Sequence, residues 1–315
     1  MTRSRGVALM TALIVVAIAT AIAAAIFFDT GLVLRRSEGA SGQERALLLA
    51  GGAEVRAARS LGEELDTGNA PIHPGQRWAN PLGPIEVEDA GVLQGQLVDL
   101  QGRFNLNSLI DKDGRIDPIA LEIFERLLRV LQIEPVWAPK FADWIDADDL
   151  PSSGGAEDDA YTSLRPGYRP PNRPVTSISE LLLLPGFDAE RFGRLAPHVA
   201  ALPRDASINL CSATPALLDA LADERQWLGA EEALVRNRER DCFPRRDAFK
   251  AALAIPEAFD RMDRAVGLSE RSRYFQLQTT SLVGTARFSL YSLLRYETAP
   301  PGPPRLRVML RRRTP

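Results

Sequence analysis

The N-terminal segment constrains this chain most strongly, because it holds an apolar run long enough to cross a membrane. Val7 to Phe28 contains no charged residue, and Arg3 and Arg5 precede it. At about 1.5 Å per residue, this run would form a helix about 33 Å long, which matches the hydrocarbon thickness of a bilayer. Since basic flanks stay in the cytoplasm, the sequence predicts a single span with the C-terminal body on the opposite side.

Two interpretations of this segment are open. A cleavable secretory signal would need small residues at its end, and Ala23-Ala24-Ala25 would supply them. Alternatively, the short basic leader ending in Gly6 resembles the leader of type IV prepilins, which a dedicated prepilin peptidase cleaves after the glycine. That resemblance implies a cut between Gly6 and Val7, with the apolar helix retained in the mature chain.

One residue departs from the general prepilin pattern. The fifth residue of the mature chain would be Thr11, where most pilin-like proteins carry a glutamate that neutralises the terminal amine of a neighbouring subunit. A carboxylate inside a membrane is costly without such a partner. In lacking this glutamate, the chain resembles the K-class minor pseudopilins of type II secretion. The resemblance implies a subunit with no neighbour above it in the fibre.

Composition narrows the functional classes. The chain has 315 residues, 45% hydrophobic and 25% charged, which is typical of a globular protein. The net charge is −3, and 36 basic residues stand against 41 acidic ones after Phe28. A mildly acidic body argues against nucleic acid as a partner. The two histidines, His73 and His198, lie in no recognisable catalytic arrangement, so the sequence predicts no enzyme.

Hydrophobic periodicity predicts strands on both sides of a helical block. One helix is expected from residue 7 to about 65, a loop over 66–84, and strands between 85 and 110 with a turn at Gly102. Asp117-Pro118 is a helix start signal. Further helical patterns cover 137–145, 177–184, 188–201, 214–224, 229–239 and 245–252. Strand patterns return at 273–297 and 305–312, and the charged last strand suits a sheet edge.

We therefore predict an α+β fold: a long pilin-like N-terminal helix and a small antiparallel sheet, with a large inserted all-α domain. The expected divisions are a leader (1–6), a transmembrane and assembly helix (7–28), a pilin-like helix with the first strands (29–114), the inserted domain (115–271) and the last strands (272–315).

An acidic loop carries the densest chemistry. Six acidic residues fall between positions 146 and 159, and Asp143 precedes them. Such crowding repels itself unless a cation neutralises it, and oxygen donors without nearby His or Cys favour Ca²⁺. The spacing does not match an EF-hand. The predicted ligands are Asp146, Asp148, Glu157 and Asp158, then Asp143 and Asp159, with Asn172 completing the shell.

Other interpretations of the acidic residues stay open. The loop could be a solvated charged surface with helix caps, and paired carboxylates also serve acid–base hydrolysis, although nothing else in the sequence supports catalysis. The segment Asp111–Asp117 looks like half of a calcium loop. Its glycine comes too early for an EF-hand, so a turn followed by a helix cap is the favoured interpretation.

The cysteine pair and a hairpin-like segment each allow two interpretations. Cys211 and Cys242 follow the apolar segment, where an oxidising compartment would allow one disulfide, and two buried free thiols are the other interpretation.

Ser179–Asp188 resembles a helix-hairpin-helix, a motif that often binds the DNA backbone. The turn has one glycine where two are usual, so an architectural hairpin is favoured over a membrane-anchored DNA-binding protein.

The central segment resembles the signature of the K-class minor pseudopilins. The matching residues are Asp143-Trp-Ile-Asp-x-Asp, Pro151, Gly155-Ala-Glu-Asp, Tyr161, Tyr168-x-Pro-x-Asn172 and Ser179-Glu-Leu. Flanking matches are Asp99–Ser108 and Ile208–Pro215, although Cys211-Ser212 stands where Asn-Thr is more usual. The resemblance covers most of the chain, in order.

This resemblance implies a function in protein export. It predicts structural calcium in the acidic loop, an inner-membrane anchor and a periplasmic body. It also predicts a place at the tip of a type II secretion pseudopilus, beside the I and J minor subunits and the major pseudopilin, where the fibre is nucleated and capped to support export of folded proteins. A minor pilin of a type IV pilus is the related alternative.

Overall fold

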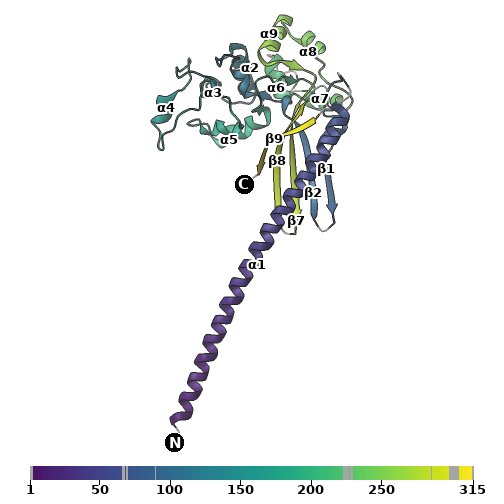
Figure 1. Ribbon diagram of the computed structural model, residues 1–315. Coiled ribbons are helices and arrows are strands. Elements are labelled where there is room, and N and C mark those ends of the chain that lie inside the picture. Colours follow the sequence, from purple (N-terminus) through teal and green to yellow (C-terminus); the bar gives the residue numbers. More distant parts are fainter. Residues whose placement is uncertain are drawn as a thin grey trace.

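The computed structural model describes residues 3–65, 68, 70–88, 90–222, 227, 230–284, 286–297 and 305–313. Helix α1 (Arg3–Leu65) is one continuous helix of 63 residues, as the sequence predicted. It is long and apolar enough to cross a membrane. Its N-terminal part extends away from the body, and its C-terminal part packs on a sheet (Figure 1).

The sheet has five antiparallel strands in the order β1-β2-β7-β8-β9. Their bounds are β1 (Leu82–Val87), β2 (Gly91–Asp99), β7 (Tyr274–Val283), β8 (Ala286–Glu297) and β9 (Arg305–Arg313). Small residues of α1, including Ala53 and Ala57, pack closely on Phe275, Leu277 and Leu294 of the sheet. The basic strand β9 lies at the edge, as expected.

A turn does end at Gly102 between two strands, as predicted, but strand β2 and the following strand β3 (Phe104–Asn105) belong to different sheets and do not form a hairpin. The first hairpin turns before Gly91, whose φ of 124° suits glycine. Strand β2 ends at Asp99, whose carboxylate accepts from the Gln101 N–H and starts the 3₁₀ turn η2 (Leu100–Gly102). Gly102 also allows a close approach, because a side chain there would overlap the carbonyl oxygen of Ser212.

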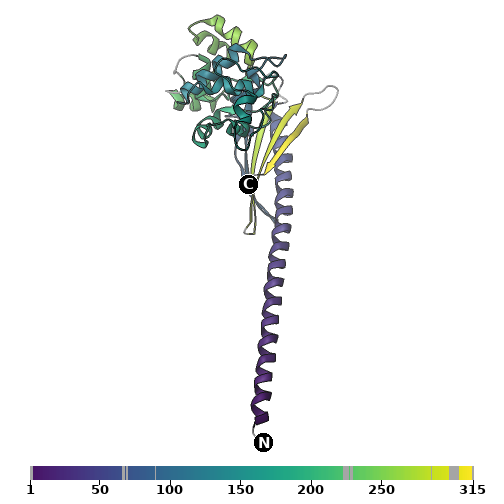
Figure 2. The ribbon, with the colours of Figure 1, turned by 90° about the vertical axis from the view of Figure 1, so that its left-hand side faces the viewer.

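A helical block lies between β2 and β7 in the sequence and at the end of the sheet far from the N-terminus (Figure 2). Its α-helices are α2 (Pro118–Val130), α3 (Trp137–Ile145), α4 (Asp158–Thr162), α5 (Ala189–Leu195), α6 (Pro215–Ala222), α7 (Glu231–Arg238), α8 (Arg246–Ala252) and α9 (Pro256–Val266). Short parallel pairs join β3 (Phe104–Asn105) to β4 (Val199–Ala200) and β5 (Ile208–Asn209) to β6 (Leu268–Ser269). The remaining 3₁₀ turns are η1 (Arg77–Ala79), η3 (Leu106–Leu109), η4 (Ile178–Leu183) and η5 (Ala196–His198).

Several expected elements differ in detail. The pattern at 177–184 forms the 3₁₀ turn η4 instead of an α-helix. The pattern at 188–201 contains α5 but then leaves the helix at η5, because Val199 and Ala200 pair with strand β3. Helices α4 and α9 were not expected, although Pro256 at the first position of α9 is a start signal.

A buried polar network joins the block to the sheet. The Asp99 carboxylate at the end of β2 accepts from Ser272 Oγ at 2.6 Å and from Asn209 Nδ2 at 3.0 Å. Asn209 Nδ2 also lies 2.8 Å from the carbonyl oxygen of Ile72, in the loop after α1. Burial raises the pKa of Asp99, and these donors act against that rise. The network ties four distant segments together where the two parts meet.

Candidate metal centre

Helix α3 places two of the predicted carboxylates. Asp143 lies in its last turn, and Asp146 follows as the C-cap, with its N–H bonded to the Ala142 carbonyl at 2.9 Å. The opposite face of α3 packs into the core through Phe141, which contacts Phe124 and Phe187 at ring distances of 5.7 and 5.1 Å. The core therefore fixes the end of the helix that carries both acids.

The loop after α3 returns to the same point. The Ser152 N–H donates to Asp143 Oδ2 at 3.0 Å, and the Gly155 N–H bonds the Ser152 carbonyl at 2.9 Å. A side chain at Gly155 would overlap the Asp143 carboxylate, so only glycine lets the loop pass this closely. This return brings Glu157 beside the end of α3.

Asp143, Asp146 and Glu157 form the cluster that the sequence could not single out. One carboxylate oxygen from each lies within 4.8 Å of the others. The three residues are 0%, 4% and 6% exposed. Asp143 Oδ1, Asp146 Oδ1 and both Glu157 oxygens have no hydrogen-bond partner. Buried carboxylate oxygens without donors fit a hard cation such as Ca²⁺, which prefers oxygen ligands in flexible geometry.

Electrostatics of the cluster agree with its geometry. Burial, followed by repulsion from Asp143, raises the pKa values of Asp146 and Glu157 to about 7. Burial also raises the pKa of Asp143. A bound cation would lower these pKa values again, because it stabilises the ionised carboxylates.

The other predicted ligands lie in different surroundings. Asp148 is exposed, with Oδ1 accepting from the Leu150 N–H at 2.9 Å, and Asp159 is exposed in the first turn of α4. Asp158 lies 3.4 Å from Arg169 as an ion pair. Asn172 Nδ2 donates to the carbonyl of Asp148, whereas its buried Oδ1 has no hydrogen-bond partner. Asn172 therefore remains a candidate ligand beside the three-carboxylate cluster.

Aromatic rings pack against one another next to the acidic loop. Trp144 and Tyr161 pack edge to face at 5.2 Å, and Tyr161 contacts Tyr168 at 5.6 Å. The neighbouring segment 111–117 forms the expected turn and cap, since the Asp117 side chain accepts from the N–H groups of Ile119 and Ala120. The Gly114 carbonyl accepts from the Ala147 N–H at 3.0 Å, which anchors the acidic loop to this turn.

The other residues singled out in the sequence form a disulfide, a helix cap and part of a long helix. Cys211 and Cys242 are joined by a disulfide and are both buried. Asp188 caps α5 by accepting from the Arg191 N–H at 2.8 Å, so its own carboxylate occupies the place where a DNA phosphate would bind. Gly6 and Val7 lie within the continuous helix α1, as does Thr11.

The acidic cluster predicts a pH dependence. In calcium-free buffer, it is expected to lower the melting temperature as the pH rises from about 4 to about 7. Unfolded carboxyls lose their protons near pH 4, whereas Asp146 and Glu157 keep theirs to about pH 7, so the unfolded state gains relative stability across this window.

Comparing calcium-loaded with calcium-free samples isolates the cluster from other titrating groups. The calcium-induced rise in melting temperature should grow from about pH 5 to about pH 8, because protons compete with the cation for the same oxygens. Fluorimetric melting curves across this range measure it. A calcium effect that stays constant with pH would show that these two carboxyls do not bind the ion.

A membrane-length helix that continues onto an antiparallel sheet, with a helical block inserted between the strands, defines a pilin-like anchored subunit. The family model described as type II secretion system (T2SS), protein K matches residues 102–204. The chain is 35% identical over 301 residues to type II secretion system protein K of Pseudomonas aeruginosa, covering 92% of this chain and 88% of the relative. It is 33% identical over 307 residues to the protein K of Pectobacterium carotovorum, covering 93% and 92%.

A solved structure agrees with these relatives. The match has a TM-score of 0.75 and 26% identity, and it covers 89% of this chain and 99% of a chain in the GspK-GspI-GspJ complex from the enterotoxigenic Escherichia coli type 2 secretion system. The chain belongs to the type II secretion system protein K family and is a minor pseudopilin, a structural component of the secretion machinery. The α+β pilin-like prediction is thereby confirmed.

Proposed function

We propose that this minor pseudopilin forms the tip of the pseudopilus, where it nucleates and caps the fibre during export of folded periplasmic proteins. The observation that supports this proposal is the position of the helical block at the end of the sheet far from the N-terminal, membrane-length part of α1 (Figure 2). A block of this size leaves no room for a further subunit to stack above it.

The test is the position of the protein in assembled fibres. A tag inserted in the exposed α8–α9 region of the full chain should appear at one end of each pseudopilus in immunogold electron microscopy. Labels distributed along the fibre would contradict capping. If deleting the gene for this chain left the number of fibres unchanged, that result would contradict nucleation.

The partners follow from the similarity to the E. coli complex, in which a related chain is assembled with GspI and GspJ. We propose that this chain assembles with the corresponding two minor subunits and stands above the major pseudopilin. The inner membrane holds α1, and the body lies in the periplasm. Calcium bound by Asp143, Asp146 and Glu157, with Asn172 beside them, would neutralise the cluster and stiffen the acidic loop.

Processing by prepilin peptidase is also part of the proposal. Support comes from α1, which runs without a break through Ala23–Ala25 into the part that packs on the sheet. Cleavage after Ala25 would remove the anchor, whereas cleavage after Gly6 keeps it.

Replacing Gly6 with leucine is therefore expected to block processing, because the larger side chain would obstruct the peptidase at the scissile bond. Mass spectrometry of the chain co-expressed with its peptidase should show wild-type protein beginning at Val7 and uncleaved variant. The matched control is Gly31→Leu, in the same helix with open space around it, which should be cleaved normally. Normal cleavage of the Gly6 variant, or a cut beyond Ala23, would rule out the prepilin interpretation.

A further inference from the structure

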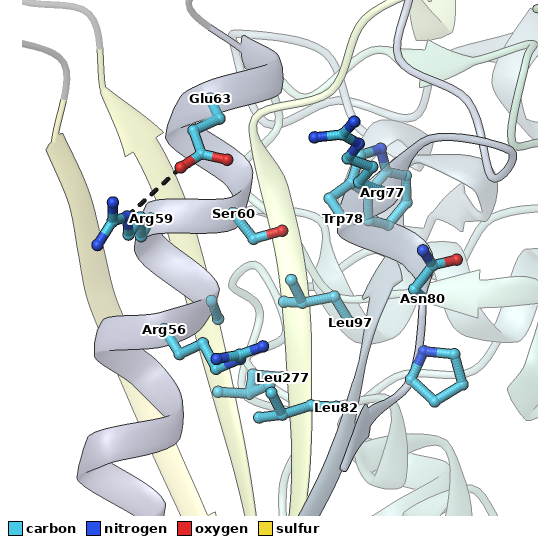
Figure 3. Close-up of a pocket in the computed structure, with 12 residues that line it drawn as sticks. Arg56, Arg59, Ser60, Glu63, Arg77, Trp78, Asn80, Leu82, Leu97 and Leu277 are labelled. Atoms are coloured by element: carbon cyan, nitrogen blue, oxygen red, sulfur yellow. Dashed lines mark hydrogen bonds and ion pairs between the residues drawn. The ribbon is translucent and has the colours of Figure 1, made fainter.

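We propose that a groove between α1 and the segment that follows it docks a carboxylate-bearing, partly apolar segment of a neighbouring minor pseudopilin. The groove has a volume of about 510 Å³. One wall is α1 around Arg56 and Ser60, the other is the 77–82 segment, and Leu97 and Leu277 line the space between them (Figure 3). This inference rests on the function proposed above and assigns it a contact surface.

Both walls of the groove are held in place before any partner arrives. The Arg77 N–H donates to Glu64 Oε1 of α1 at 3.3 Å, which links the two walls. Trp78 is buried and packs edge to face on Phe275 of β7 at 5.2 Å. Its indole N–H donates to Gln76 Oε1 at 3.0 Å. A partner would therefore meet a preformed site and lose little free energy in ordering it.

The charges in the groove are unbalanced. Three arginines line it, at positions 56, 59 and 77, against two acidic residues, Glu63 in the lining and Glu64, which links the two walls. Arg59 Nε lies 3.4 Å from Glu63 Oε1, but both side chains are exposed, so this pair contributes little. Among the residues that the structure describes, no carboxylate lies within ion-pair distance of the Arg56 or Arg77 guanidinium.

The arrangement of these cations selects the chemistry of the occupant. Figure 3 shows Arg56 and Ser60 extending from the helix and Arg77 extending from the opposite wall toward it. Leucine side chains lie between them. Guanidinium groups bind carboxylates in a bidentate way, and an apolar floor buries an aliphatic or aromatic side chain. An extended segment with an acidic residue beside an apolar one satisfies both features.

Distance from the membrane excludes a lipid headgroup as the occupant. Arg56 lies 28 residues after Phe28, the last residue of the apolar run, within the same unbroken helix. At about 1.5 Å per residue this places the groove about 42 Å from the membrane end of the helix. In the fibre, a neighbouring subunit reaches this level of α1 and a lipid does not.

The first experiment reverses the charges. The full-length chain carrying Arg56→Glu and Arg77→Glu is co-produced with the other two minor pseudopilins of its own secretion system and purified in detergent. Recovery of the partners should fall at least about 10-fold, because the variant repels the acidic segment. The matched control is Arg264→Glu on α9, an exposed arginine outside the groove, which should recover the partners at the wild-type level.

The second experiment leaves the arginines intact, so it does not depend on folding of the double variant. A photo-crosslinking amino acid replaces Ser60, whose hydroxyl faces the groove (Figure 3). After irradiation, mass spectrometry should identify a peptide from another minor subunit with an Asp or Glu beside an apolar residue. A Ser60 variant that crosslinks to no partner within the assembled complex would overturn the proposal.

The outcomes separate this inference from the proposed function. If the wild-type chain and the double variant both recover the partners, the groove is not the docking site and the tip function stands. If the wild-type chain itself recovers neither partner, the proposed assembly fails and the groove inference fails with it. Loss confined to the double variant, together with a Ser60 crosslink, supports both.

Discussion

Removing calcium is expected to lower the melting temperature of the full-length chain by about 5–11 °C. With free calcium about 100-fold above its dissociation constant, occupancy adds about 2.7 kcal/mol to the free energy of unfolding. For a domain of about 150–250 residues, each kcal/mol corresponds to about 2–4 °C. Fluorimetric melting of the detergent-solubilised chain, with calcium and with EGTA, measures the difference.

A variant of the cluster sharpens this prediction. Asp146→Asn combined with Glu157→Gln keeps the side-chain shapes but removes two of three mutually repelling carboxylates. The variant should lose the calcium response and should melt above the wild type in EGTA, because the raised pKa values of both groups show that their charges are unfavourable without a cation.

The matched control removes the same number of charges from the same loop. Asp158→Asn with Asp159→Asn changes two acidic residues that lie outside the three-carboxylate cluster. This control should keep the calcium response. If it loses the response while the Asp146/Glu157 variant keeps it, calcium binds elsewhere in the loop.

Replacing Cys211 and Cys242 together with serine is expected to lower the free energy of unfolding by about 3–4 kcal/mol. The bridge closes a loop with a sequence separation of 31 residues, and a cross-link of that span removes about this much chain entropy from the unfolded state. The corresponding fall in melting temperature is about 6–16 °C. Urea denaturation, followed by tryptophan fluorescence, measures the change.

Two controls separate the bridge from the packing of its sulfur atoms. A reducing agent should lower the stability of the wild type by a similar amount and leave the serine variant unchanged. The Cys211→Ala/Cys242→Ala variant avoids placing hydroxyls in a buried site, since both cysteines are at most 3% exposed. If reduction leaves the wild type as stable as before, the loss in the variants comes from packing.

Sequence patterns predicted an element correctly where residues close together in the chain decide its conformation. The apolar run and the helix formers after it predicted α1 over almost its whole length, because helical hydrogen bonds join residues four apart. The cap at Asp117 and the basic edge strand β9 followed from similarly local rules. The order of strands, helical block and strands also predicted the α+β class.

Local patterns failed where a long-range contact decided the conformation. Gly102 lies in a turn, as predicted, but nothing in the sequence indicated that its lack of a side chain also allows contact with Ser212, more than a hundred positions away. The pattern at 188–201 looked helical throughout, but Val199 and Ala200 pair with β3. Periodicity carries no information about either partner.

The sequence by itself determined that this chain has a membrane-length helix, an α+β body and a loop with six acidic residues between positions 146 and 159. Only the tertiary structure decided which carboxylates converge, because Asp143, Asp146 and Glu157 meet through the close passage of Gly155 rather than through their spacing. It likewise decided that Arg56 and Arg77 face one groove. The physical reason is the same in both cases: packing brings together charges that the chain keeps apart.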